Sequence, residues 1–172
     1  MWRYLVVNYG YKAKKGIGSI FYFTLPPYGI KIKSKEGRLI DKTANRLETT
    51  LKKLKVLIVD DDEISRWLLA KMLGNISSEV LNAENGLEAV ETLKSDPDIE
   101  LVLMDIKMPV MDGYEATRQI RQFNKKSFII AQTAFTLKGD KEKAIGAGCN
   151  SYMSKPVNKA NLLTLLEKHF KA

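Results

Sequence analysis

From residue 55 onward, short runs of apolar residues alternate with longer stretches in which apolar residues recur every three or four positions. The run Val56–Val59 predicts a buried strand, and the stretch from Ile64 to Leu73 has the spacing of a helix that Gly74 ends. The same strand-then-helix unit recurs four times. Further strands are predicted at 79–81, 100–104, 127–131 and 151–153, and further helices at 86–94, 114–123, 138–145 and 158–170.

Five such units in succession predict the α/β fold class. Strands that read as continuous apolar runs are buried on both faces, and helices between them require a parallel sheet with right-handed crossovers. An open, doubly wound sheet of five parallel strands with helices on both faces meets these requirements. Ligands and chemistry gather outside the carboxyl ends of the strands in such a sheet. The residues that follow each strand are therefore the first candidates for a functional site.

Chemically useful side chains follow four of the five predicted strands. They are Asp60, Asp61 and Asp62 after the first strand, Asp105 after the third, Thr133 after the fourth and Lys155 after the fifth. Because the carboxyl ends of parallel strands meet at one edge of the sheet, we expect these side chains to share a rim.

The acidic residues on this rim predict a site for a hard cation. Asp60, Asp61 and Asp105 would present carboxylate oxygens, and Mg²⁺ prefers a few such oxygens together with several waters and a phosphate. Asp62 and Glu63 instead suit the N-terminus of the following helix. The acidic run alone is equally compatible with a solvated helix cap; Asp105, Thr133 and Lys155 favour the metal site.

The same rim could carry a phosphoryl group. A carboxylate can attack phosphorus and form an aspartyl phosphate, and such a transfer depends on positioning and charge neutralisation. Mg²⁺ and Lys155 would each pair with phosphoryl oxygens, and the Thr133 hydroxyl would donate a hydrogen bond to another. Asp105 is the candidate nucleophile.

The net charge of +8 is unevenly spread along the 172 residues. Residues 1–54 hold 12 Lys+Arg and 3 Asp+Glu, whereas residues 55–172 hold 16 and 17. A basic segment joined to a near-neutral domain is a weak indication of nucleic-acid binding, so we expect no nucleic-acid partner. Binding through the tyrosines of the basic segment remains an alternative, and steep salt dependence would support it.

Cysteine and histidine each occur once. Cys149 can form no intramolecular disulfide, which fits a reducing, cytoplasmic location, and we expect it to be a small buried hydrophobe. His169 should be a solvated side chain near the end of the last helix, because no second His or Cys is present to share a metal. No apolar run approaches the length that a bilayer requires.

The order and spacing of the rim residues resemble those of a known family. Val59-Asp60-Asp61, the stretch from Met104-Asp105 to Asp112-Gly113, Thr133-Ala134 and Lys155-Pro156 together resemble the receiver domain of two-component response regulators. The resemblance covers residues 54–172 and implies a flavodoxin-like sheet with strand order 2-1-3-4-5.

The resemblance also implies roles for the rim residues. Asp105 would accept the phosphoryl group, and Asp61, Asp105 and the backbone carbonyl of Lys107 would ligate Mg²⁺, with Asp60 reaching the metal through water. Thr133 and Lys155 would contact the phosphoryl oxygens. The Lys155-Pro156 bond would be cis, as is usual in the family, and would aim Lys155 into the pocket.

A switch is implied as well. Tyr152 would turn inward when Thr133 is drawn to the phosphate, which would change the face made by the fourth helix, fifth strand and fifth helix of the receiver. A homodimer through this face is a partner that the resemblance suggests. Packing of Tyr152 in the core is the simpler alternative.

The N-terminal part reads differently. Residues 16–27 contain a glycine turn, an aromatic strand and a Pro-Pro stop, which by themselves predict a β-hairpin. They are similar to the last glycine box and closing strand of the ATP-binding domain of sensor histidine kinases. We therefore expect residues 1–28 to be a kinase remnant, 29–53 a basic linker with a short helix near 43–54, and the chain to lack kinase activity.

The leading functional hypothesis is a phosphorelay receiver. It would take a phosphoryl group from a histidine kinase and pass it to a histidine phosphotransfer partner, in the cytoplasm, at the end of a hybrid kinase anchored in the inner membrane. Because no output domain is recognisable after Ala172 in this sequence, we expect a relay role and not that of a transcription factor. One alternative is a constitutive interaction module. A second is a haloacid-type phosphatase, but such an enzyme would need an acidic residue at the position of Lys107. A third is a flavin carrier, which the acidic loop after the first strand disfavours.

Overall fold

The computed structural model describes residues 9–14, 18–23, 53–133 and 139–170, in two units that are treated separately below. In the N-terminal unit, β1 (Tyr9–Lys14) pairs with β2 (Gly18–Phe23) in antiparallel register, from Tyr9 opposite Phe23 to Lys14 opposite Gly18. This confirms the β-hairpin. The glycine turn around Gly16 and the linker, including its predicted helix, lie outside the described residues.

The C-terminal unit contains a single parallel sheet of five strands in the order β4-β3-β5-β6-β7. The strands are β3 (Leu54–Val59), β4 (Ser77–Ala83), β5 (Leu101–Asp105), β6 (Phe128–Thr133) and β7 (Ser151–Ser154). Numbered within the sheet, this order is 2-1-3-4-5, which confirms the predicted doubly wound topology. The strand order reverses beside β3, so that the ends of β3 and β5 flank the switch point.

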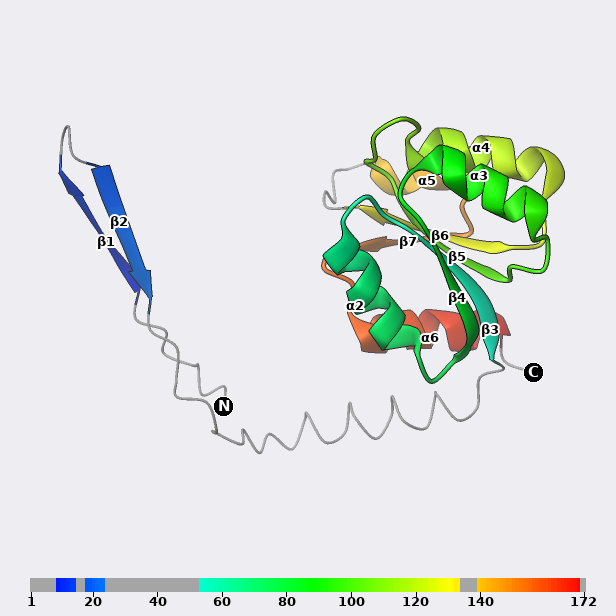
Figure 1. Ribbon diagram of the computed structural model, residues 1–172, viewed down its shortest axis with the longest axis horizontal. Coiled ribbons are helices and arrows are strands. Elements are labelled where there is room, and N and C mark those ends of the chain that lie inside the picture. Colours follow the sequence, from blue (N-terminus) through cyan, green and yellow to red (C-terminus); the bar gives the residue numbers. More distant parts are fainter. Residues whose placement is uncertain (1–8, 15–17, 24–52, 134–138, 171–172) are drawn as a thin grey trace. The chain divides into compact units, whose positions relative to one another are not determined.

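Five helices cover the two faces of the sheet (Figure 1). They are α2 (Glu63–Leu73), α3 (Gly86–Ser95), α4 (Gly113–Phe123), α5 (Asp140–Ala147) and α6 (Lys159–Phe170). Helices α2 and α6 pack on one face and α3, α4 and α5 on the other. Each face has its own apolar core, because side chains alternate between the two sides along every strand.

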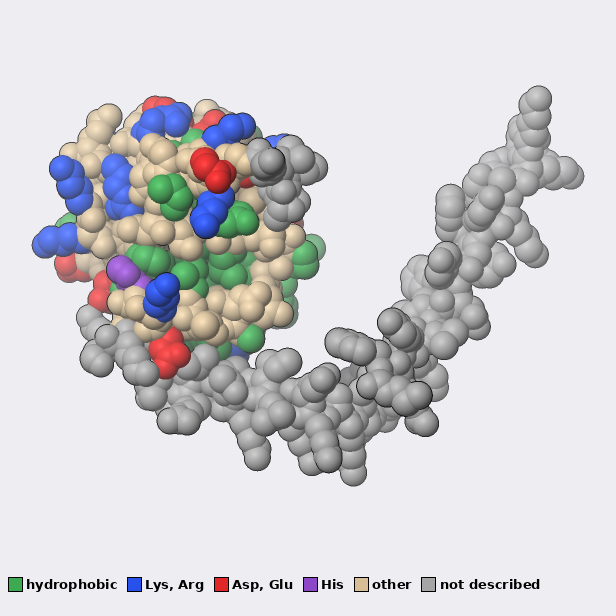
Figure 2. All heavy atoms as spheres, turned by 180° about the vertical axis from the view of Figure 1, so that it is seen from behind, with side chains coloured by type: hydrophobic (Ala, Val, Ile, Leu, Met, Phe, Trp, Pro, Cys, Tyr) green, Lys and Arg blue, Asp and Glu red, His purple; other side chains and the backbone are tan. Residues whose placement is uncertain are grey.

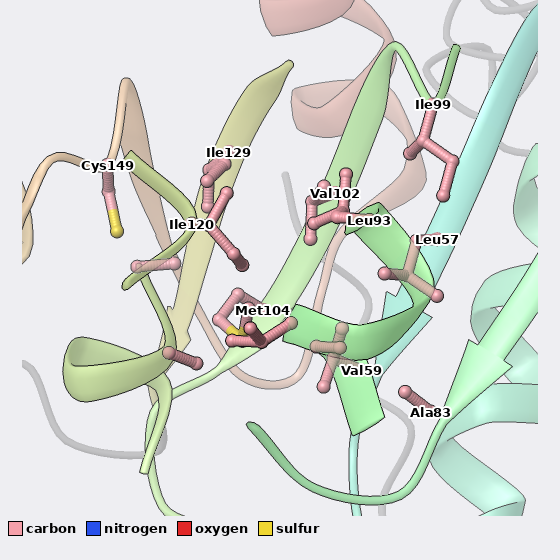
Figure 3. Packing of buried hydrophobic residues seen from close by; sticks show 14 of the residues in the cluster. Leu57, Val59, Ala83, Leu93, Ile99, Val102, Met104, Ile120, Ile129 and Cys149 are labelled. Atoms are coloured by element: carbon pink, nitrogen blue, oxygen red, sulfur yellow. The ribbon is translucent and has the colours of Figure 1, made fainter. Parts of the chain in front are cut away.

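The core beneath α3, α4 and α5 shows how the central strands are held (Figure 3). Leu57 of β3, Val102 and Met104 of β5 and Ile129 of β6 are each fully buried and belong to one apolar cluster with Ile120 of α4. Burying an aliphatic side chain of this size contributes about 1.5–3 kcal/mol. The packing therefore fixes the ends of β3, β5 and β6 relative to one another.

Element boundaries differ from the sequence prediction mainly at β4 and α5. Strand β4 is longer than the predicted 79–81 because this edge strand is mostly exposed or half-buried and carries polar residues on both sides of Val80 and Leu81, so that it forms no continuous apolar run. Helix α5 lies two residues beyond the predicted 138–145 because Gly139 and Gly148, both left-handed, bracket it. The periodic pattern did not mark either glycine as a cap.

The one cysteine and the one histidine of the sequence lie largely as expected. Cys149 is buried, 3.6 Å from the Thr117 hydroxyl, and burial raises the pKa of its thiol. His169 is exposed, as predicted, but its ring stacks on Phe128 with the ring centroids 3.8 Å apart.

Candidate functional site

The ends of β3 and β5 bring three carboxylates together at the switch point. Val59 is in register with Met104, so that Asp60 and Asp105 leave adjacent strands side by side. One oxygen from each of Asp60, Asp61 and Asp105 lies within 4.8 Å of the others. Asp60 and Asp105 are buried, whereas Asp61 is exposed. The rim predicted from the sequence is therefore present.

Lys155 is the counter-ion of the two buried carboxylates. Its Nζ lies 2.7 Å from Oδ2 of Asp60 and 2.7 Å from Oδ2 of Asp105. The Lys155–Pro156 peptide bond is cis, as the family resemblance implied. The backbone N–H of Lys155 also donates to the carbonyl of Thr133 at 2.7 Å, which ties the loop after β7 to the end of β6.

Local capping explains how the acidic run is arranged. Asp62 is the N-cap of α2, and its Oδ2 accepts hydrogen bonds from the backbone N–H and the hydroxyl of Ser65. These bonds lower the pKa of Asp62. The backbone N–H of Asp62 donates to Oδ1 of Asp60 at 3.1 Å, and Arg66 donates to the backbone carbonyl of Asp60. Asp62 thus serves as the helix cap that the sequence predicts. Asp60 is fixed by hydrogen bonds to its carboxylate and to its backbone carbonyl.

Burial and ion pairing oppose each other at the centre of the site. Burial raises the pKa of Asp105, and the nearby carboxylate of Asp60 adds to this, outweighing the ammonium of Lys155. At Lys155, burial favours the neutral amine, but the hydrogen bonds from its ammonium to Asp105 and Asp60 leave its pKa raised. The lysine is therefore cationic, and the site holds more negative charge than it can compensate.

This excess of negative charge fits a divalent cation. The donors are carboxylate oxygens, which Mg²⁺ prefers over nitrogen or sulfur, and exposed Asp61 leaves one side open to water and a phosphate. The predicted fourth ligand, the backbone carbonyl of Lys107, is in the loop directly after β5. The backbone N–H of Lys107 donates to Oδ1 of Asp105 at 3.3 Å, so Lys107 lies beside the Asp105 carboxylate.

Thr133 and Tyr152 occupy the neighbouring strands. Asp105 is in register with Gln132 of β6, so that Thr133 stands one residue beyond it, at the same rim, and Thr133 is buried. Tyr152 of β7 is half-buried, opposite Ala131, and packs against the core under α3, α4 and α5. Packing in the core, the simpler of the two predicted roles for Tyr152, therefore describes its position here.

Gly113 supports the site in a way that sequence reasoning missed. Asp112 is the N-cap of α4, and Gly113 is the first residue of this helix. A Cβ on Gly113, however, would overlap the backbone carbonyl of Asp105. The backbone N–H of Gly113 also donates to the backbone carbonyl of Ile106 at 3.0 Å. The start of α4 thus packs directly on the end of β5, and a glycine at the first position of a helix carries no sequence signal for such a contact.

Comparison with known proteins gives one consistent family. The family model described as response regulator receiver domain matches residues 56–167. Hybrid signal transduction histidine kinase G of Dictyostelium discoideum is 39% identical over 136 residues, which are 76% of this chain and 4% of the kinase. Chemotaxis protein CheY of Halobacterium salinarum is 43% identical over 109 residues, 63% of this chain and 89% of CheY. The chain thus spans a small part of the kinase and most of CheY.

Solved structures agree with this result. The receiver domain of Ssk1, in complex with the Saccharomyces cerevisiae histidine phosphotransfer protein Ypd1, matches with a TM-score of 0.65 and 35% identity, over 70% of this chain and 90% of that one. The receiver domain of sensor histidine kinase PA1611 from Pseudomonas aeruginosa has a magnesium ion in its active-site cleft. It matches with a TM-score of 0.62 and 32% identity, over 70% of this chain and 99% of that one.

Proposed function

This chain belongs to the response regulator receiver domain family, and we propose that Asp105 is its phosphoacceptor in a two-component phosphorelay. The observation that carries the proposal is the pairing of the buried Asp105 carboxylate with Lys155 at 2.7 Å, inside a cluster of three carboxylates. A buried nucleophile with a fixed cation beside it is arranged for phosphoryl transfer, which depends on positioning and electrostatics.

The proposed step moves a phosphoryl group from a kinase phosphohistidine. An oxygen of the Asp105 carboxylate bonds to phosphorus, the P–N bond breaks, and its electron pair stays on the imidazole nitrogen, which takes up a proton from water. Lys155 pairs with one phosphoryl oxygen and the Thr133 hydroxyl donates to another. Mg²⁺ held by Asp60, Asp61, Asp105 and the Lys107 carbonyl would neutralise part of the phosphoryl charge.

The consequence of phosphorylation would appear at the edge of the sheet. Movement of the Thr133 hydroxyl toward the phosphoryl group would open space for the Tyr152 ring to turn inward. The backbone N–H of Lys155 donates to the carbonyl of Thr133, and Lys155 follows β7 directly, so the end of β7 would respond. The surface formed by α5, β7 and α6 would then change, and a homodimer through this surface is part of the proposal.

The upstream and downstream partners follow from the same proposal. A histidine kinase would supply the phosphoryl group and a histidine phosphotransfer protein would receive it. The hairpin of β1 and β2, similar in sequence to the end of a kinase ATP-binding domain, supports an origin in a hybrid kinase, as does the identity with hybrid kinase G. The chain itself would be a relay component without kinase activity.

The test is phosphorylation by a small molecule. The chain is incubated with acetyl phosphate and Mg²⁺, and its intact mass is followed over time. We expect one Mg²⁺-dependent phosphoryl adduct that is stable in acid and labile in base. It should be absent in Asp105→Asn and present in Asp98→Asn, whose carboxylate is exposed and remote from the site.

An absent adduct would contradict the proposal, provided that the protein is folded and binds Mg²⁺. The chain would then be a constitutive interaction module built on a receiver fold. Turnover of a small phosphate ester without a lasting adduct would favour a phosphatase instead.

A further inference from the structure

A cavity of about 350 Å³ lies between α2 and the loop that follows β7. Its walls are mostly apolar and come from both elements: Leu68, Leu69, Met72, Pro156 and Val157. Gln132 of β6 also lines the cavity, which we therefore call the Gln132 pocket. Proteins hold small molecules in mostly apolar pockets of about 300–1,000 Å³, so this pocket is large enough for one.

The side chain of Gln132 lies on the pocket side of the sheet. Ile130 belongs to the core beneath α2 and α6, whereas Ala131 belongs to the core on the other face. Because successive side chains alternate across a strand, Gln132 points to the same side as Ile130, toward α2. Gln132 is 1% exposed, so its amide is enclosed by the protein.

The amide of Gln132 carries an acceptor without a donor. Its Oε1 accepts no hydrogen bond from any residue that the structure describes. Two donors that line the pocket are already engaged: the hydroxyl of Ser65 donates to Asp62, and the ammonium of Lys155 donates to the two buried carboxylates of the site. Since a buried amide oxygen without a partner is unfavourable, a molecule that brings a donor to Gln132 gains a hydrogen bond there.

Water alone fits this pocket poorly. A buried water typically makes about three hydrogen bonds, and the apolar walls offer none. Because Ser65 and Lys155 are engaged elsewhere, Gln132 is the group in the lining that gains most from an added donor. A ligand that fills the pocket must therefore be mainly apolar, with a single donor.

The charges of the lining balance each other. Among the described residues that line the pocket, the charged ones are Asp60 and Lys155, whose Oδ2 and Nζ atoms lie 2.7 Å apart. A charged ligand would leave water for mostly apolar surroundings, where each charge already has its partner. A neutral ligand avoids this cost.

We propose that the Gln132 pocket binds a neutral, rigid aromatic molecule with one N–H donor, which hydrogen-bonds Oε1 of Gln132. The apolar body of this molecule packs between α2 and the loop after β7, against Leu69 and Val157. A rigid body loses little conformational entropy on binding. The site goes beyond the proposed function, because it requires neither a phosphoryl group nor Mg²⁺.

Occupancy of the pocket bears on the phosphoacceptor. Lys155 lines the pocket, and its Nζ lies 2.7 Å from Oδ2 of Asp105. A ligand packed against Lys155 hinders the movement of its ammonium from Asp105 to a phosphoryl oxygen. The ligand therefore slows phosphorylation. This consequence rests on the proposed function, whereas the binding itself does not.

The experiment compares two probes that differ in one donor. Indole has a single N–H group, and N-methylindole has nearly the same apolar body without it. Each probe is titrated into the full chain, and NMR follows the side-chain amide of Gln132 and the backbone amides of Leu69 and Val157. We expect saturable shifts at these positions with indole, and binding of N-methylindole weaker by about fivefold or more.

Gln132→Leu tests the acceptor. In this variant the affinity for indole should fall about fivefold or more, and the two probes should bind within about twofold of each other. Gln119→Leu is the matched control, because it makes the same change on α4, where the amide of Gln119 donates to Glu115. Its preference for indole should equal that of the parent chain.

The effect on phosphorylation is measured with acetyl phosphate and Mg²⁺. Indole at about ten times its dissociation constant should slow labelling of the parent chain about threefold or more, because it restrains the positioning lysine. N-methylindole at the same concentration should slow it less.

The outcomes separate the ligand site from the function beside it. No saturable shift at Gln132 with either probe, or equal affinities of the parent chain for both probes, would overturn the proposal. Binding of indole with unchanged labelling would uphold the site and overturn its effect on Asp105. A parent chain that is never labelled, even without indole, would instead overturn the proposed function and leave the binding result standing.

Discussion

At the scale of single residues, Asp105 carries the conflict between stability and function. Burial raises its pKa, so the folded state binds the proton of this carboxyl more tightly than the unfolded chain does. Below the pKa that Asp105 has in the unfolded chain, its carboxyl is protonated in both states and does not lower the free energy of unfolding. As pH rises through the higher pKa of the folded state, ionising the buried carboxyl lowers the free energy of unfolding. Without divalent cations, the ionised site destabilises the fold near neutral pH.

Asp105→Asn should remove this cost. We expect the variant to be more stable than the parent chain near pH 7 in EDTA, with an advantage that shrinks as pH is lowered toward about 4. Urea unfolding across this pH range measures the difference. The exposed Asp98→Asn should follow the parent curve, and a constant advantage of Asp105→Asn at every pH would contradict the argument.

Val110 holds a conformation that β-branched residues rarely adopt. Its φ is 67°, and its side chain is 80% exposed, so packing gains nothing from the strain. Val110→Gly should stabilise the fold by about 1 kcal/mol. This gain is smaller than the strain energy released, because glycine loses more backbone entropy on folding than valine does. Val110→Ala keeps a side chain at the strained position and should give no such gain in urea unfolding. An equal gain in Val110→Ala and Val110→Gly would show that backbone strain is not the cause.

Sequence reasoning located the residues of the rim and missed those that support them. Asp60, Asp105, Thr133 and Lys155 were found because each follows an apolar run, and strand ends converge in a parallel sheet. The unsatisfied amide of Gln132 could not be found this way, because a polar residue inside an apolar strand reveals neither its partners nor the cavity it faces.

At the scale of elements, the start of α4 packs against the end of β5, where Asp105 lies. Gly113 allows the helix to rest on the carbonyl of Asp105, and Gly86 similarly allows α3 to approach Met111 and Ala116. The strands and helices themselves were predictable from periodicity. Their contacts were not, because a helical period fixes which face is apolar and leaves open how closely two backbones approach.

Gly113→Ala should therefore damage both stability and phosphorylation. Its methyl group would displace α4 or the Asp105 backbone, at a cost of about 1–3 kcal/mol, and slow labelling by acetyl phosphate. Gly146→Ala is the matched control, since a Cβ there meets nothing within 4 Å and alanine favours the helix. Unchanged labelling in a folded Gly113→Ala variant would show that the contact does not position Asp105.

At the scale of the whole molecule, the receiver unit combines a rigid sheet with an electrostatically unfavourable rim. Both faces of β3, β5 and β6 are packed against helices. The strand ends therefore cannot move apart to relieve the repulsion between the carboxylates of the rim. Among the described helices, none is long and apolar enough to cross a membrane. Figure 2 shows Lys and Arg side chains spread among apolar ones on the face that carries His169.

Mg²⁺ should therefore stabilise the whole unit. A cation present at about a hundred times its dissociation constant would add about 2.7 kcal/mol of stability, because it binds only the folded site. Thermal unfolding with and without Mg²⁺ measures this. Asp61→Ala, which removes the exposed ligand, should lose most of the shift; a full shift in that variant would place the cation elsewhere.

The most direct test of the central claim is to identify the residue that carries the phosphoryl group. The chain is phosphorylated by acetyl phosphate with Mg²⁺ and treated with borohydride, which reduces the acyl phosphate to an alcohol, and its peptides are sequenced by mass spectrometry. We expect homoserine at position 105 and at no other aspartate. Homoserine at Asp60, Asp61 or Asp62, or its absence from every peptide of a labelled protein, would contradict the assignment of Asp105 as phosphoacceptor.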